Sequence, residues 1–422
     1  MDLPLMMRIK WLLFILLLSA PSGAKAQTIN AKSCSSTDVQ TALNSASAGD
    51  TVTVPAGTCS WSGLSLNKAI SLQGAGIGTT NITVTGNNTI TKQAAGIIRM
   101  ANFSFSISGS GTTNVGFTVG GSWKNGQPIV IQNNAFSVSN SSLFVINVAG
   151  GVIVSHNTFT GGWNDSFLHI YDVKDSEGSW TTADTIGNRD TKGTLNHYIE
   201  DNTFTGGTNQ GTDVDDAGRV VYRHNTFTDS SFNTHGKDSS PVGVRHYEIY
   251  NNRFYNTGAQ SNDCSAIANQ NWAIWLRGGT GVIYNNYFDN LAGSCWGTKP
   301  EIKLSIRGAE DDRPQGTCGQ VSHPVPRQLG QNYNGSSYFT DPIYFWGNTG
   351  TGNESDGWAW NNPCGFTWST FFQWGRDAIN QSITGGTAKP GYTAYTYPHP
   401  LATGSVGTGT PTNPTVLRAI VH

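Results

Sequence analysis

The middle of the chain repeats one short pattern of apolar and polar positions: an apolar β-forming residue, two further residues, Asn, any residue and Phe. The copies span Ile131–Phe136, Val154–Phe159, Ile199–Phe204, Tyr222–Phe227, Ile249–Phe254 and Ile283–Phe288. The Asn residues of successive copies lie 23, 45, 23, 27 and 34 residues apart, which indicates a unit of 22–23 residues with insertions in some intervals. A strand-like unit of this length predicts an all-β stacked solenoid, namely a parallel β-helix of about ten coils.

Each position in the repeat has a physical reason to recur. The apolar residue three before Asn and the Phe two after it are expected to point inward and to form buried columns through the coils. The Asn is expected at a corner, where it tolerates left-handed backbone geometry and can build a ladder of amide side chains. A β-sandwich whose strands happen to look alike is the alternative fold.

The N-terminus has the sequence features of an export signal. Arg8 and Lys10 precede a short apolar run, and Ala24-Lys25-Ala26 has the small residues of a signal-peptidase site. Residues 1–26 are therefore predicted to be a signal peptide, and the mature protein is expected to be secreted. No later segment approaches the roughly 20 consecutive apolar residues that a membrane-spanning helix needs, so no membrane span is expected.

Domain boundaries follow from where the repeat begins and ends. Residues 27–350 are assigned to the β-helix domain, and within it residues 34–48 predict a short amphipathic helix that caps the open end of the solenoid. Residues 310–340 contain many Pro and Gly residues and are expected to form a loop. Residues 351–402 keep aromatic residues without the repeat and are expected to wrap the solenoid, whereas residues 403–422 are a linker or tail.

Composition narrows the choice of partners and of covalent links. The 25 Lys and Arg residues nearly balance 27 Asp and Glu residues, so the net charge of −2 implies no general affinity for nucleic acid or anionic membranes. The chain is expected to act as a monomer. Six cysteines in an exported chain predict disulfides. Proximity in sequence favours, among the possible connectivities, Cys34–Cys59, Cys264–Cys295 and Cys318–Cys364.

The start of the β-helix domain resembles a known superfamily. The helix predicted at Cys34–Ala48 is followed directly by the strand segment Gly49–Gly57, which reads Gly-Asp-Thr-Val-Thr-Val-Pro-Ala-Gly. This opening is common in the pectate-lyase-like right-handed β-helix superfamily. The resemblance covers roughly residues 34–350 and implies a right-handed parallel β-helix. Because the superfamily includes polysaccharide lyases, hydrolases, epimerases and binding proteins, the resemblance leaves the activity open.

Strand alternation selects candidate substrate-binding residues on one lateral face. Where apolar residues of a strand point inward, their neighbours point outward. The outward side chains predicted to bind substrate are His169, Tyr171, Trp275, Arg277, Lys303 and Arg307. Arg277 and Arg307 are expected to stack in one column, because their surrounding segments match each other.

Two polar segments, Thr212–Arg219 and Thr234–Ser240, are expected on the same face in adjacent coils. In an extended strand Asp213 and Asp215 share a side, and so do the side chains of His235 and Lys237. Together with the outward residues above, they predict a strip of carboxylate, imidazole, ammonium and guanidinium groups beside aromatic rings. Such a strip suits an acidic sugar chain.

One chemistry that fits this strip is β-elimination on a uronic acid. The reaction needs a neutralised carboxylate, a base for the proton next to it and a donor for the leaving oxygen. Ca²⁺ could neutralise the carboxylate, and its predicted ligands are Asp213, Asp215 and Asp238. His235 or Lys237 is the predicted base, because the pKa of either side chain can be shifted into the working range. Pectate lyases, which the chain resembles, are thought to use Arg, so Arg219 and Arg277 are the alternatives.

Hydrolysis is the second chemistry, and it needs a carboxylic acid and a carboxylate base. Asp215-Asp216 followed by His235-Gly236 resembles the polygalacturonase pattern, with Thr234 in place of that pattern's first Gly. The sequence favours a secreted enzyme that cleaves an acidic polysaccharide, with elimination preferred over hydrolysis. A non-catalytic carbohydrate-binding or adhesin-like solenoid is the alternative from another class.

Overall fold

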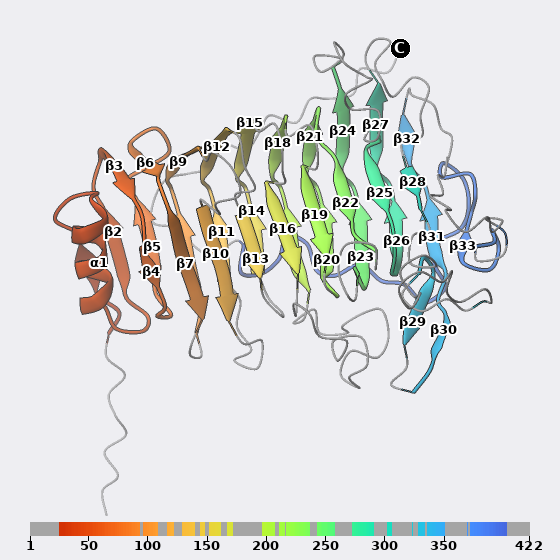
Figure 1. Cartoon of the computed structure of the whole chain (residues 1–422), viewed down its shortest axis with the longest axis horizontal. Coiled ribbons are helices and arrows are strands. Elements are labelled where there is room, and N and C mark those ends of the chain that lie inside the picture. Colours follow the sequence, from red (N-terminus) through yellow and green to blue (C-terminus); the bar gives the residue numbers. More distant parts are fainter. Residues whose placement is uncertain are drawn as a thin grey trace, which may run out of the picture.

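The chain forms three parallel β-sheets that run side by side along one axis, with the single helix of the described residues at one end (Figure 1). The computed structural model describes residues 25–92, 96–108, 116–121, 129–139, 144–147, 152–161, 167–171, 196–206, 211–215, 217–236, 243–257, 272–290, 302–305, 323, 328–333, 336–350, 369 and 372–402. Within these residues, neighbouring strands of each of the three sheets pair in parallel. The predicted parallel β-helix with an N-terminal helix is therefore confirmed.

The sheets are called A, B and C here. Sheet A contains, in order, β1 (Thr28–Asn30), β2 (Thr51–Val54), β5 (Ser71–Gly74), β8 (Ile98–Ala101), β11 (Ile129–Gln132), β14 (Val152–Ser155), β17 (His197–Glu200), β20 (Arg219–Arg223), β23 (His246–Tyr250), β26 (Thr280–Tyr284), β31 (Ile343–Trp346) and β33 (Ala378–Ile379). Sheet B contains β3 (Gly57–Trp61), β6 (Thr80–Val84), β9 (Ser104–Ser108), β12 (Ala135–Ser139), β15 (Thr158–Gly161), β18 (Thr203–Thr205), β21 (Thr226–Thr228), β24 (Arg253–Asn256), β27 (Tyr287–Asn290) and β32 (Thr349–Gly350). Sheet C contains β4 (Ser65–Leu66), β7 (Asn87–Lys92), β10 (Gly116–Gly121), β13 (Phe144–Asn147), β16 (Leu168–Tyr171), β19 (Thr212–Asp215), β22 (Phe232–Thr234), β25 (Ile274–Leu276) and β28 (Ile302–Leu304).

A ladder of buried amides joins the coils at the corner between sheets A and B. Each Asn side chain donates from Nδ2 to Oδ1 of the next one at 3.0–3.1 Å. The ladder consists of Asn134, Asn157, Asn202, Asn225, Asn252, Asn286 and Asn348. The last member has no Phe two residues on, because Gly350 takes that place, and the sequence pattern therefore missed it.

The left-handed backbone at this corner belongs to a different residue from the expected one. It is the residue before each ladder Asn that has a positive φ, between 53° and 58°, at Asn133, His156, Asp201, His224, Asn251 and Asn285. Gly347, with a φ of 62°, fills the same place before Asn348. The chain thus turns one residue early, which brings the Asn side chain inside, where its amide reaches the next coil. The expectation that the ladder Asn itself is left-handed was wrong.

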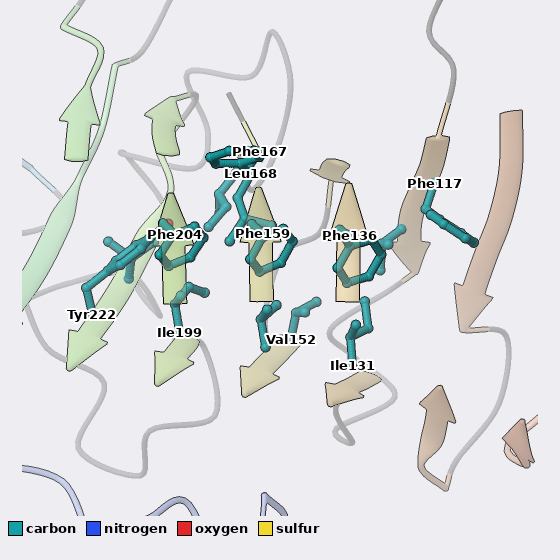
Figure 2. Close-up of a cluster of buried hydrophobic side chains, with 14 of the residues drawn as sticks. Phe117, Ile131, Phe136, Val152, Phe159, Phe167, Leu168, Ile199, Phe204 and Tyr222 are labelled. Carbon is teal, nitrogen blue, oxygen red and sulfur yellow. The ribbon is translucent and has the colours of Figure 1, made fainter. Parts of the chain in front are cut away.

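Stacked phenylalanines fill the interior beside sheet B, as the repeat predicts. Consecutive ring centroids in the column are 4.6–5.2 Å apart, and the column is formed by Phe105, Phe136, Phe159, Phe204, Phe227, Phe254 and Phe288. Figure 2 shows part of it, with Ile131, Val152 and Ile199 of sheet A facing the rings. Burying a Phe side chain stabilises a fold by about 1.5–3 kcal/mol before entropy is counted, so this column holds the coils in register.

The N-terminal end is capped and stapled. Helix α1 (Ser36–Ser45) begins after Ser35, whose side chain accepts a hydrogen bond from the backbone N–H of Asp38. Its buried residues Val39 and Leu43 join the interior of the solenoid. The predicted disulfide Cys34–Cys59 is present and ties the helix to β3. The other four cysteines, and residues 1–24 of the expected signal peptide, lie outside the described residues.

A C-terminal segment covers the outer face of sheet A. After β33 the chain runs back toward the N-terminal end (Figure 1, blue), and residues 389–402 are called the C-terminal strap. The hydroxyl of Tyr392 donates to Glu248 Oε2 in β23 at 2.7 Å. Further along, Arg223 in β20 donates to the Tyr395 carbonyl at 2.9 Å, and Arg99 in β8 donates to the Leu401 carbonyl at 3.1 Å. The strap therefore crosses sheet A against the order of its strands.

Residues 310–340 are not a loop throughout. Strands β29 (Gln331–Tyr333) and β30 (Tyr338–Thr340) form an antiparallel hairpin, which projects from the side of the solenoid (Figure 1). The sequence between the two strands contains Asn334-Gly335, a dipeptide typical of hairpin turns, within a stretch whose many Pro and Gly residues indicate a loop.

Candidate functional site

Five neighbouring strands of sheet C carry one outward row of polar and aromatic side chains. The Cα register pairs His169 with Asp213, Asp213 with Asn233, Asn233 with Trp275 and Trp275 with Lys303. Between these positions the inward residues, such as Ile170 and Val214, are fully buried in the core. The alternation predicted from the sequence thus places the row on the outside, from β16 to β28 (Figure 1).

Two carboxylates and two imidazoles meet at one end of this row. His235, directly after β22, lies with Nε2 2.9 Å from Asp213 Oδ2 and with Nδ1 3.4 Å from Asp215 Oδ2. His169 Nε2 lies 3.7 Å and 3.8 Å from the same two oxygens. His169, Asp213, Asp215 and His235 are called the carboxylate–imidazole cluster.

Exposure differs sharply within the cluster. The side chains of Asp213 and Asp215 are 5% and 9% exposed, whereas those of His235 and His169 are 16% and 33% exposed. Two buried carboxylates this close repel each other unless a positive charge lies between them. An imidazolium supplies that charge and can also give up a proton near neutral pH, so the arrangement can hold protons and transfer them to or from a bound molecule.

A lysine lies over two tryptophans at the other end of the row. Lys303 Nζ is 3.9 Å from the ring centroid of Trp272 and 4.5 Å from that of Trp275. The indole N–H of Trp275 donates to Ser305 Oγ at 2.8 Å, and that of Trp272 donates to Asn233 Oδ1 at 3.0 Å. Both rings are buried, while Lys303 is partly exposed. The tryptophans therefore position a cation, rather than offering an open surface on which a sugar could stack.

Arg277 faces outward but is not exposed. Only 3% of it is accessible, because its guanidinium lies 4.2 Å from the ring of Trp275 and its Nε donates to the Thr234 carbonyl at 2.6 Å. Its backbone N–H also donates to Thr234 Oγ1 at 3.0 Å. Arg277 thus fastens the end of β25 to β22, a role that differs from the exposed substrate contact expected from alternation alone.

Of the other predicted site residues, the structure describes the backbone positions of Arg219 and Tyr171. Arg219 begins β20 in sheet A, paired with His246, so it is outside the row on sheet C although it follows Asp215 closely in sequence. Tyr171 lies opposite Asp215 in the register. Asp216, Lys237, Asp238 and Arg307 lie outside the described residues, and their predicted roles stay predictions.

Sequence reasoning missed Asn233 and Trp272. Asn233 lies two residues before His235, so the alternation applied to His235 places it on the same face. Trp272 precedes its strand, and no periodicity indicates its side-chain direction. Its contact with Asn233 depends on how the coils stack.

The described residues hold no group of three or more His, Cys, Asp or Glu side chains arranged to bind a metal ion. Ca²⁺ prefers six to eight oxygen ligands, whereas the Oδ2 atoms of Asp213 and Asp215 face imidazole nitrogens. The part of this cluster that is described therefore does not fit Ca²⁺. No helix within the same residues is long and apolar enough to cross a membrane.

No protein-family model matches the chain, and no curated protein matches it. Among solved structures, ORF18 of Geobacillus virus E2 is 14% identical, with a TM-score of 0.38, over 80% of this chain and 60% of that one. The PL6 family alginate lyase AlyGC is 14% identical, with a TM-score of 0.39, over 81% of this chain and 50% of that one. An alginate lyase from Paenibacillus sp. str. FPU-7 is 15% identical, with a TM-score of 0.26, over 73% of this chain and 97% of that one. The chain thus spans 60% and 50% of the length of the first two proteins.

Proposed function

We propose that the outer face of sheet C binds an acidic, uronate-containing polysaccharide and cleaves it by β-elimination. The observation that carries this proposal is the shared row: the carboxylate–imidazole cluster lies at one end and the partly exposed ammonium of Lys303 at the other. Lys303 lies two strands beyond β22, about 10 Å along the solenoid. That spacing lets it hold the carboxylate of one sugar residue while another residue occupies the cluster.

The two histidines have different roles in this proposal. His235 has each ring nitrogen close to a carboxylate oxygen, which fixes the ring between Asp213 and Asp215, so it is the group that passes a proton to the leaving oxygen. His169 is the more exposed ring and is oriented by Asp213 and Asp215 through Nε2, so it is the base that removes the proton next to the sugar carboxylate. The electron pair of that C–H bond forms the new C=C bond, and the glycosidic C–O bond breaks. The leaving oxygen takes a proton from the cluster.

Hydrolysis is less well supported by the same geometry. It requires one protonated and one ionised carboxyl group with room for sugar and water between them. Here Oδ2 of Asp213 and Oδ2 of Asp215 both lie against the same two imidazole rings.

A panel of polymers tests the proposal. Purified protein is incubated with polymers of guluronate, mannuronate, galacturonate and glucuronate, with added Ca²⁺ and with chelator. Ultraviolet absorbance from unsaturated products is the expected result on at least one polymer. Reducing ends without that absorbance would indicate hydrolysis, and binding without any product would favour the non-catalytic solenoid. A loss of activity in chelator would assign a metal to residues beyond the described cluster.

Variants assign the residues. His169→Asn and His235→Asn are each expected to lower turnover by about 10²-fold or more, in the range usual for a lost proton-transfer group. The matched control is His156→Asn, because His156 occupies the left-handed corner that Asn fills in other coils. It is expected to leave turnover unchanged. Equal losses in all three variants would remove the cluster from the reaction.

A further inference from the structure

A buried arginine fastens the β29–β30 hairpin next to the cluster. Arg245 is fully buried, and its Nη2 donates to Asn332 Oδ1 at 3.5 Å and to the Tyr333 carbonyl at 3.4 Å. Its backbone N–H donates to the Gly218 carbonyl at 3.1 Å, within the turn that follows β19. Because a buried guanidinium keeps its charge and needs these acceptors, the hairpin is held at this turn.

The hairpin presents two tyrosines to that turn. Tyr333 and Tyr338 are cross-strand partners with ring centroids 4.9 Å apart, and both pack against Ala217. Ala217 comes two residues after Asp215, and its N–H donates to the Gly243 carbonyl at 2.5 Å. Val244, which follows Gly243, donates from its N–H to the His235 carbonyl at 2.8 Å. The tyrosine pair therefore packs on the turn after β19, and this turn is hydrogen-bonded to Gly243, whose neighbour Val244 is hydrogen-bonded to His235.

These rings differ from the tryptophans of sheet C in what they offer. Trp272 and Trp275 are buried beneath Lys303, whereas Tyr333 and Tyr338 are partly exposed. A partly exposed tyrosine presents a flat apolar face with a hydroxyl at its rim, and this combination matches the C–H face and hydroxyl rim of a sugar ring.

We propose that Tyr333 and Tyr338 form a sugar-stacking subsite for the residue that follows the one held at the carboxylate–imidazole cluster. The substrate class, a uronate chain, rests on the function proposed above. The tyrosines bind the ring face and carry no charge, while Lys303 binds a carboxylate. A polymer is then held on two sides of the reacting bond, and chains long enough to reach the tyrosines bind more tightly than shorter ones.

Tyr338→Ala tests the subsite, with Tyr338→Phe and Phe339→Ala as matched variants. Phe339 is 36% exposed and pairs with Asn332 in the register, so its side chain lies on the opposite face of the hairpin. Two readouts are used: retardation in gels containing the polyuronate, which needs no turnover, and KM and kcat on a ladder of oligouronates. Tyr338→Ala is expected to weaken binding of long chains about tenfold, chiefly through KM. Tyr338→Phe and Phe339→Ala are expected to bind like the unchanged protein.

The outcomes separate this proposal from the proposed function. If the unchanged protein is retarded by the polyuronate but does not cleave it, and Tyr338→Ala weakens the retardation, the subsite is supported and the proposed elimination is overturned. If Tyr338→Ala cleaves oligouronates of every chain length with the KM of the unchanged protein, the elimination is supported and the subsite is overturned. Equal weakening by Phe339→Ala also overturns it, since the effect would then come from the hairpin's fold. If Tyr338→Ala and Tyr338→Phe unfold at the same temperature, a difference in their affinity for the polymer comes from the lost aromatic ring and not from stability.

Discussion

The outer faces of sheets A and C both carry charged residues, but these residues are fully buried on sheet A and partly exposed on sheet C. On sheet A, Glu200 and Arg223 form an ion pair at 2.7 Å with both side chains fully buried, and the C-terminal strap covers them. Strap carbonyls of Tyr395 and Thr396 accept hydrogen bonds from the Arg223 guanidinium, and the backbone N–H of His399 donates to Glu200. On sheet C the carboxylate–imidazole cluster keeps partly exposed rings, 33% for His169 and 16% for His235.

Whether other residues bury these charged groups decides which role they can have. A buried ion pair with its hydrogen bonds completed has no proton to give and no face for a ligand, so it serves the fold. Carboxylates held against partly exposed imidazoles can exchange protons with a bound molecule, so they can serve chemistry. The difference between the two faces lies in the strap, which crosses sheet A and completes its hydrogen bonds.

Breaking the buried pair should produce the largest effect. Glu200→Gln leaves the Arg223 charge in the interior without its carboxylate and is expected to lower the free energy of unfolding by about 3–5 kcal/mol. Urea denaturation measures this change. Adding Arg223→Met should restore part of the loss, because the uncompensated charge is then gone. A Glu200→Gln protein as stable as the original would show that the pair contributes nothing to the fold.

The matching change on sheet C should act on turnover. Asp213→Asn keeps the shape of the side chain but removes a charge that orients both histidines, and turnover is expected to fall by about 10²-fold, or about 2.7 kcal/mol. The free energy of unfolding should change by less than about 1 kcal/mol, because one of two neighbouring carboxylates is removed. A large loss of stability with normal turnover per folded molecule would make the cluster a structural feature like the pair on sheet A.

Acid should loosen the strap first. Burial, reinforced by the nearby Arg223 guanidinium, lowers the pKa of His399 to about 4, and burial also lowers the pKa of His246 under the strap. The unfolded chain binds these protons near pH 6.5, so folding stability is complete above that value and falls as the pH drops toward 4. The His399 contribution is on the order of 1 kcal/mol after allowance for its partial exposure. His399→Gln should flatten urea midpoints measured between pH 7 and pH 4.5, and an unchanged slope would contradict the assignment.

The smallest effect is expected at the far end of the row on sheet C. Lys303→Met keeps the contact with both indoles but removes the ammonium, so KM for a polyuronate should rise about two- to fivefold with little change in kcat. Added salt should raise the KM of the unchanged protein more than that of the variant. An unaltered KM at low salt would remove Lys303 from the substrate site.

The candidate site was predictable where strand alternation applied. The period-two pattern placed His169, Asp213, Asp215, His235 and Lys303 outward, and the structure puts them on one face of sheet C. Alternation predicts the direction of a side chain but not whether other residues cover it. Arg277 and Trp275 therefore face outward, as predicted, although both are buried. Arg219 is close to Asp215 in sequence, but a turn carries it into another sheet, which no local pattern reveals.

The sequence by itself determined the parallel β-helix, the inward phenylalanines and the amide ladder, because each arises from a local pattern repeated once per coil. It also indicated the first disulfide, because Cys34 and Cys59 are close in sequence. Only the tertiary structure decided which outward residues lie together in the candidate site. Three contacts join segments that lie 31 to 302 residues apart in sequence: residues 389–402 on sheet A, Lys303 over Trp272, and the hairpin beside Ala217. Such contacts depend on the shapes of surfaces that exist only after the coils have stacked, and no periodicity along the chain records them.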